Sequence, residues 1–162
     1  MTADDLIAAL SQQRQALLDA IAGLSDDQLD RKGMVGKWSI KNALAHLTAQ
    51  EEVLTRITPE RLRTGAYPEE LRAINADADA SNARDVAARE HLSPTEQLAA
   101  LAQARADLST MIRELGDEAL AREQPWPQWS GTLASYFLAN VGEHEREHVE
   151  AVRVGAERLR TE

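Results

Sequence analysis

The sequence predicts an all-α protein, folded as an antiparallel four-helix bundle with an additional middle helix. Apolar residues recur at alternating steps of three and four along several long segments, which is the spacing of a bundle helix. Capping motifs stand just before these segments, where a helix would begin. No convincing run of alternating apolar and polar residues suggests a strand.

Composition limits the classes of protein to consider. The 162 residues are 43% hydrophobic and 28% charged, which fits one domain, residues 1–162. A net charge of −9, with Lys and Arg scattered among acids, argues against nucleic acids and anionic membranes as partners. The absence of cysteine excludes disulfides and thiolate ligands. The acidic N-terminus does not resemble a signal peptide, and no apolar run is long enough to span a bilayer, so we expect a cytoplasmic protein.

The first helix is predicted from Thr2, as its N-cap, to Gly23. Its apolar seam consists of Ile7, Leu10, Leu17, Ile21 and Leu24. Arg14 interrupts this seam. We interpret it as a surface arginine whose aliphatic stem lies along the apolar face.

The second long helix is predicted to begin at Ser39, after a capping box at Ser25 and a loop with two glycines. Its seam consists of Ile40, Leu44, Leu47, Glu51 and Leu54. A second line beside the seam carries Ser39, Asn42, His46, Gln50 and Val53, so His46 borders the core. The prolines and glycine between Thr58 and Pro68 predict a connector.

A polar, alanine-rich helix is predicted from Pro68 to Glu90, the additional middle helix. The capping box at Ser93, with Pro94 at the first helical position, then begins a helix that should stop at Gly116. Its seam consists of Leu98, Leu101, Arg105, Leu108, Ile112 and Leu115.

The segment Pro125–Trp129 is a rigid aromatic connector, and the last helix begins after it, near Ser130 or Thr132. Trp126 and Trp129 either cover the end of the core or form a wall of a substrate pocket. Both interpretations remain open at the level of sequence.

His144 and His148 lie one helical turn apart, on an apolar stripe that faces the core. The other members of the stripe are Leu133, Phe137, Val141, Val152 and Leu159. Inward side chains of facing helices are where bundles build metal sites. We therefore expect His46, His144 and His148 to bind one divalent transition metal, with zinc, nickel or iron as the candidates.

Other residues are weaker candidates. Gln50, Asn42 and Tyr136 are expected to support the metal ligands or to line the pocket with the two tryptophans. Glu145 and Glu147 flank the ligands and are weak candidates for a catalytic base, although we favour a surface position for Glu145. His91 stands apart in a connector and is interpreted as solvated.

The Trp38-Ser39 helix start, followed by Ala45-His46-Leu47 and by a closing His144-x3-His148, resembles the DinB/YfiT-like superfamily. The resemblance covers nearly the whole chain. It implies a four-helix bundle with a three-histidine metal site, often zinc or nickel, and frequently a homodimer. Some members are transferases that use bacillithiol, mycothiol or glutathione, and others are hydrolases or self-resistance proteins against reactive metabolites.

The working hypothesis is a metal-dependent enzyme in which the ion lowers the pKa of a water or an external low-molecular-weight thiol, which then attacks an electrophilic small molecule. The alternative is a non-catalytic protein that binds or sequesters a small molecule. A zinc protease is less favoured, although His144-Glu145-Arg146-Glu147-His148 satisfies the H-E-x-x-H pattern with Glu145 as base. The extended protease pattern would need glycine and histidine where Ala151 and Val154 stand.

Overall fold

The computed structural model describes residues 1–126 and 128–161, in which every named element is helical. Pro127, within the predicted Pro125–Trp129 connector, and Glu162, the last residue of the predicted domain, lie outside the described residues. The elements are α1 (Ala3–Ile21), α2 (Asp26–Asp30), α3 (Ile40–Thr64), α4 (Glu69–Ala76), α5 (Ala78–Ala88), α6 (Pro94–Ala121), α7 (Leu133–Phe137), the π-helical η1 (Leu138–Glu143) and α8 (His144–Thr161). None of these helices is both long enough and apolar enough to cross a membrane.

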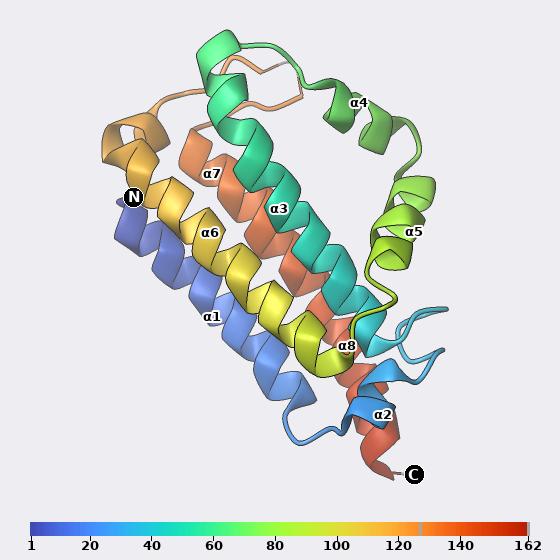
Figure 1. Ribbon diagram of the computed structural model, residues 1–162. Helices are drawn as coiled ribbons and strands as arrows, with labels where there is room; N and C mark the ends of the chain where they lie inside the picture. Colours follow the sequence, from blue (N-terminus) through green and yellow to red (C-terminus); the bar gives the residue numbers. More distant parts are fainter. Residues whose placement is uncertain (127, 162) are drawn as a thin grey trace.

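Four long rods pack side by side: α1, α3, α6 and the continuous α7–η1–α8 (Figure 1). The closest neighbours are α3 with α6 and α1 with α8, and both of these pairs run in the same direction. Thr48 bonds to Gln97, and further along both helices Glu51 bonds to Arg105. The pairs α1–α6 and α3–α8 are antiparallel. The bundle is therefore not antiparallel throughout, because α4 and α5 carry the chain back to the end of the molecule where α3 began.

Four helices begin with a capping box, at Ser25 and Ser93, where the sequence predicts a box, and at Thr2 and Ser39, where it predicts an N-cap. The side chains of Thr2, Ser25, Ser39 and Ser93 each accept a backbone N–H three residues on, and the reciprocal bond is made in each case. Thr132 caps α7, so the second of the two predicted starts is the observed one. Local sequence thus determines where these elements begin.

Three predictions about where helices end need correction or refinement. The predicted connector from Thr58 to Pro68 begins too early, because α3 continues through Pro59 to Thr64 and is capped by Gly65, which adopts the left-handed conformation at φ 68°. The predicted middle helix is two helices, α4 and α5, because the Asp77 side chain caps the second. Gly116 does interrupt α6, with φ 75°, but the helix resumes beyond it to Ala121.

The core has two apolar clusters, and charged residues separate them. Along α1, Leu10 belongs to one cluster and Leu17 to the other, and Arg14 lies between them. The surface interpretation of Arg14 is wrong, since only 7% of this residue is exposed. Glu145 was also placed at the surface and is instead 1% exposed. Each can be buried because opposite charges meet it: Arg14 pairs with Glu145 and Glu51, and Glu145 also pairs with Arg105.

Candidate metal centre

The structure brings the three predicted histidines together. One nitrogen from each of His46, His144 and His148 lies within 4.8 Å of the others, a spacing that could hold one metal ion. The Nε2 atoms of His46 and His144 are 3.1 Å apart. The three pairs of ring centroids are separated by 4.8 to 5.0 Å. His46 comes from α3, and the other two come from the first turns of α8.

The local backbone explains how these rings converge. The Ser39 cap fixes the start of α3 and so sets which face His46 occupies. The π-helical segment η1 ends at Glu143, immediately before His144. A π-helical turn shifts the register of the residues that follow it and occurs frequently at functional sites. Here it turns both histidines of α8 toward α3.

Burial keeps the three imidazoles neutral. Burial, together with the nearby His148, lowers the pKa of His46 to about 4, and burial together with His46 and His148 lowers the pKa of His144 to about 3. Burial also lowers the pKa of His148. Neutral imidazole is the form that ligates a metal, so near pH 7 all three side chains are ready to bind without losing a proton.

The Nδ1 atom of His46 is buried and has no hydrogen-bond partner within the described part of the chain. An imidazole with one orphaned nitrogen in a core is costly unless the other nitrogen makes a strong interaction. The Trp38 ring lies beside His46, with the two ring centroids 5.5 Å apart. The donor set therefore fits a metal better than it fits a core held together by neutral hydrogen bonds.

A cavity of about 240 Å³ opens beside the histidines. Gln50 and Tyr136, both predicted for the site, line it together with His46 and His144. Gln50 donates through Nε2 to the backbone carbonyl of Asn140, at 2.6 Å, which links α3 to η1 at the cavity wall.

Sequence reasoning missed the opposite wall, which α4 and α5 supply through Asn75, Asn82 and Asp85. Burial raises the pKa of Asp85. The positive charges of Arg89 and Arg84 lower this pKa in part, and the carboxylates of Glu70 and Glu52 raise it. The available signal was the recurrence of short polar side chains on one face of the middle segment. Nothing in the sequence indicated that this face turns toward the bundle.

Several predicted residues lie elsewhere. Asn42 closes the capping box of α3 and bonds to Lys32 and Glu90, so it does not support the histidines. His91 and Glu147 are exposed. For His91 this agrees with the predicted solvated position in a connector. The negative charge of Glu147 opposes the lowering of the pKa of His148.

Trp126 and Trp129 lie beside Tyr136, with ring centroids 5.0 Å and 5.5 Å from its ring. Trp129 lines a cavity adjacent to that of the histidines, and the 5% exposed Trp126 belongs to the core. Trp126 is therefore a core residue, whereas Trp129 lines a cavity, and the substrate-pocket interpretation stays a prediction.

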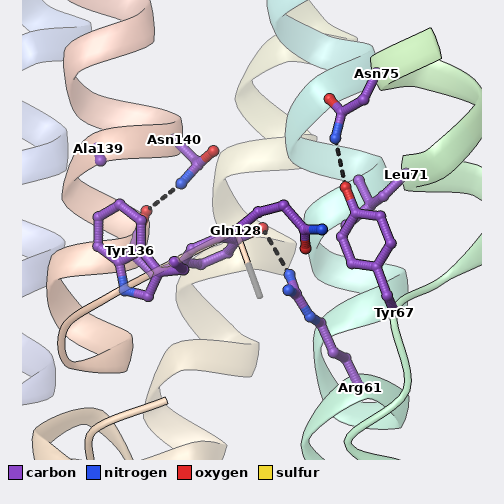
Figure 2. A pocket seen from close by; sticks show the side chains of 9 residues that line it. Arg61, Tyr67, Leu71, Asn75, Gln128, Tyr136, Ala139 and Asn140 are labelled. Atoms are coloured by element: carbon purple, nitrogen blue, oxygen red, sulfur yellow. Dashed lines mark hydrogen bonds between the residues drawn. The ribbon is translucent and has the colours of Figure 1, made fainter. Parts of the chain in front are cut away.

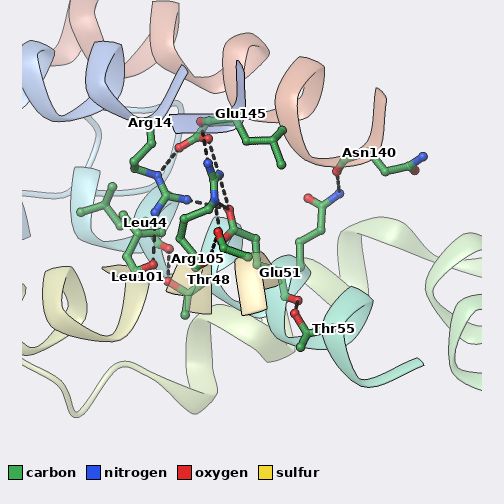
Figure 3. Close-up of polar contacts among 12 residues, drawn as sticks. Arg14, Leu44, Thr48, Glu51, Thr55, Leu101, Arg105, Asn140 and Glu145 are labelled. Atoms are coloured by element: carbon green, nitrogen blue, oxygen red, sulfur yellow. Dashed lines mark hydrogen bonds and ion pairs between the residues drawn. The ribbon is translucent and has the colours of Figure 1, made fainter. Parts of the chain in front are cut away.

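Four charged residues, of which the site hypothesis considers only Glu145, form a buried network in the core (Figure 3). Glu145 pairs with Arg14 and, at 2.7 Å, with Arg105. Glu51 accepts from the same two guanidinium groups, at 2.6 Å from Arg14 and 2.5 Å from Arg105. The sequence signal was present, because Arg14, Glu51 and Arg105 each interrupt an apolar seam and their charges are complementary.

This network bears on the protease alternative. The Glu145 carboxylate is held by two guanidinium groups in the core and is 1% exposed, so it is not free to act as a general base beside the histidines. The H-E-x-x-H pattern therefore arises here from two histidines of the candidate metal site and a structural carboxylate.

Comparisons with known proteins agree with this fold. The chain is 24% identical over 161 residues to the uncharacterized protein YuaE of Bacillus subtilis (strain 168), covering 94% of this chain and 98% of YuaE. Its fold is similar to the crystal structure of an uncharacterised protein from Escherichia coli UTI89, with a TM-score of 0.75, 13% identity and coverage of 97% of this chain and 94% of the other. The profile of the DinB superfamily matches residues 9–152, and the chain therefore belongs to the DinB superfamily.

Proposed function

We propose that His46, His144 and His148 bind one divalent transition metal, for which zinc and nickel are the preferred candidates and iron is the third. We further propose that the protein uses this metal to act on an electrophilic small molecule. The observation that carries the proposal is the convergence of three neutral, partly buried imidazole nitrogens within 4.8 Å of one another at a cavity. Three imidazole ligands leave coordination positions open, as catalytic sites require.

The metal, when bound, would lower the pKa of a water or an external thiol at the end of the cavity. The chain supplies the surroundings for this chemistry. Gln50 fixes α3 against η1, and the half-buried Asp85 faces the same cavity with its pKa raised by burial. A carboxylate in that setting can take a proton from a nucleophile more readily than a solvated one. We therefore prefer Asp85 to Glu147 as the candidate base.

The second candidate function is non-catalytic binding of a small molecule. The cavity wall favours it in one respect, since half of the polar side chains that line it are amides, those of Gln50, Asn75, Asn82 and Asn140. Amides orient a ligand but do not transfer protons. Asp85 is the carboxylate among the residues that line the cavity, and its role separates the two candidates.

Metal content tests the ligand assignment. Protein purified without an affinity tag should contain close to one transition metal ion per chain by elemental analysis. The His144→Ala variant should lose the ion, because removing one of three ligands leaves a weak site, whereas His91→Ala should keep it, since His91 is exposed and apart from the site. Equal retention in the two variants would rule out the assignment.

Turnover separates an enzyme from a binding protein. Zinc-loaded protein would be incubated with 1-chloro-2,4-dinitrobenzene or 4-nitrophenyl acetate, with and without glutathione. A thiol-dependent product indicates a transferase, and a thiol-independent product indicates a hydrolase. In either case Asp85→Asn should slow the reaction by roughly a hundred-fold while leaving metal content unchanged. Absence of product in every combination would favour the binding protein.

A further inference from the structure

A second cavity, of about 370 Å³, adjoins the histidine cavity and has a buried arginine in its wall (Figure 2). Arg61, near the end of α3, is 3% exposed. Its guanidinium carbon lies 3.6 Å from the ring centroid of Trp126 and 5.2 Å from that of Tyr67. Aromatic faces stabilise a cation without supplying the hydrogen-bond acceptors that its N–H groups need.

Arg61 lacks those acceptors. Among the described residues, its side chain makes one hydrogen bond, a long one of 3.4 Å from Nη1 to the hydroxyl of Tyr136, and its buried Nε has no partner there. No carboxylate in that part of the chain forms an ion pair with it, whereas the buried Arg14 and Arg105 each pair with two. Burial lowers the pKa of Arg61, which reflects the same uncompensated charge.

A buried guanidinium with unused donors is costly, and an anion that enters beside it removes much of that cost. The planar fork of arginine matches a carboxylate in two parallel hydrogen bonds. The walls of this cavity suit a flat organic molecule, because the rings of Tyr67, Trp129 and Tyr136 line it together with Asn75 and Asn140.

The arginine cavity continues toward the histidines. Leu71, Asn75, Tyr136 and Asn140 line both cavities. Tyr136, Asn140 and His144 are spaced about one helical turn apart along the continuous helix α7–η1–α8. The distance along the helix axis from Tyr136 to His144 is therefore roughly 12 Å. A molecule whose anionic end lies at Arg61 would extend along this face toward the metal ligands.

We propose that Arg61 binds the carboxylate of a small, flat organic acid, whose other end lies at the histidine site. The carboxylate site itself is independent of the proposed metal function, and only the placement of the reacting end depends on it. The ligand class is therefore an aromatic or unsaturated carboxylic acid with an extended body.

Calorimetric titration of the full chain with phenylacetate and with the neutral phenylacetamide tests the proposal, in chelator-treated and in zinc-loaded protein. Phenylacetate should bind both forms, and the amide should bind roughly ten-fold more weakly or worse, since it cannot form a charged hydrogen-bonded pair. Arg61→Gln should abolish the preference for the acid. Arg61→Lys, which keeps the charge but not the fork, should retain only part of it.

The matched control is Arg113→Gln, which removes an exposed arginine of α6 and should leave the preference intact. Equal binding of acid and amide by the wild type would overturn the proposal, as would an unchanged preference in a folded Arg61→Gln or Arg61→Lys variant. A preference found only in zinc-loaded protein and kept in those variants would place the carboxylate on the metal. That result would overturn the arginine site and leave the metal site standing.

Discussion

Four charged side chains lie in the middle of the core, one from each long helix: Arg14, Glu51, Arg105 and Glu145. Their charges sum to zero, and the two guanidinium groups also donate to the backbone carbonyls of Leu101 and Leu10. A buried ion pair adds little net stability compared with apolar residues, but its geometry is exacting. The network can therefore fix the rotation and the axial position of all four long helices relative to one another, including the helix that carries His144.

Removal of one charge from this network should be strongly destabilising. Glu145→Gln leaves two buried guanidinium groups with a weaker partner, and we expect the free energy of unfolding to fall by about 3 kcal/mol. Urea denaturation at pH 7 measures this. Glu150→Gln, an exposed glutamate of the same helix, should change it by less than about 0.5 kcal/mol. Similar small losses in both variants would show that the network is not important for stability.

The residue scale also shows what the sequence could and could not indicate about the site. The convergence of the three histidines could be predicted, because imidazoles on or beside an apolar stripe stand out against the residues around them. Asp85, Asn82 and Arg61 could not, since polar residues in polar segments look the same whether they face solvent or a cavity. Their exposure depends on how α4, α5 and the end of α3 pack.

At the scale of elements, α3 is longer than its sequence suggests. Proline within a helix removes one N–H and crowds the carbonyl one turn earlier, here that of Thr55. The helix nevertheless continues, because the residues on either side of Pro59 are held by the core. Ile57 and Arg61 are 7% and 3% exposed. Tertiary packing thus outweighs a local preference, and the added turns carry Arg61 to its cavity.

Pro59→Ala should therefore stabilise the protein. The substitution restores the missing hydrogen bond of α3 at an exposed position, and we expect the free energy of unfolding to rise by about 1 to 3 kcal/mol. Thermal and urea unfolding measure it. The exposed Glu60→Ala serves as a control for helix propensity and should have little effect. A loss of stability in Pro59→Ala would mean that the proline restricts the unfolded chain more than it strains the helix.

At the scale of the whole molecule, the histidine site joins α3 to α8, two elements far apart in the sequence but adjacent in the bundle. Its burial couples the stability of the fold to pH. In the metal-free protein the pKa values of His46 and His144, about 4 and about 3, lie below the ordinary 6.5 of an unfolded histidine. Between these values the unfolded state binds more protons, so acid favours unfolding.

Metal-free protein should accordingly lose stability as the pH falls from about 6.5 toward 4, while these two histidines contribute no slope above pH 6.5. Zinc at a hundred times its dissociation constant should add about 2.7 kcal/mol at pH 7, because it binds the folded state. This gain should vanish in acid, where protons compete for the imidazoles. Calorimetry across this range, with and without chelator, measures both effects, and His144→Asn should weaken both. A zinc effect that persists unchanged at pH 4 would contradict the assignment.

The sequence by itself determined the helical class, the capped starts of the helices and the candidate ligands, because capping and helical periodicity are local properties that neighbouring residues decide. The tertiary structure alone decided that α3 and α6 run parallel, that Arg14 and Glu145 are buried against each other, and that Asp85 and Arg61 face cavities. Those facts depend on which distant segments pack together, and a charged or polar residue is stable in a core only where such a partner, or a ligand, meets it.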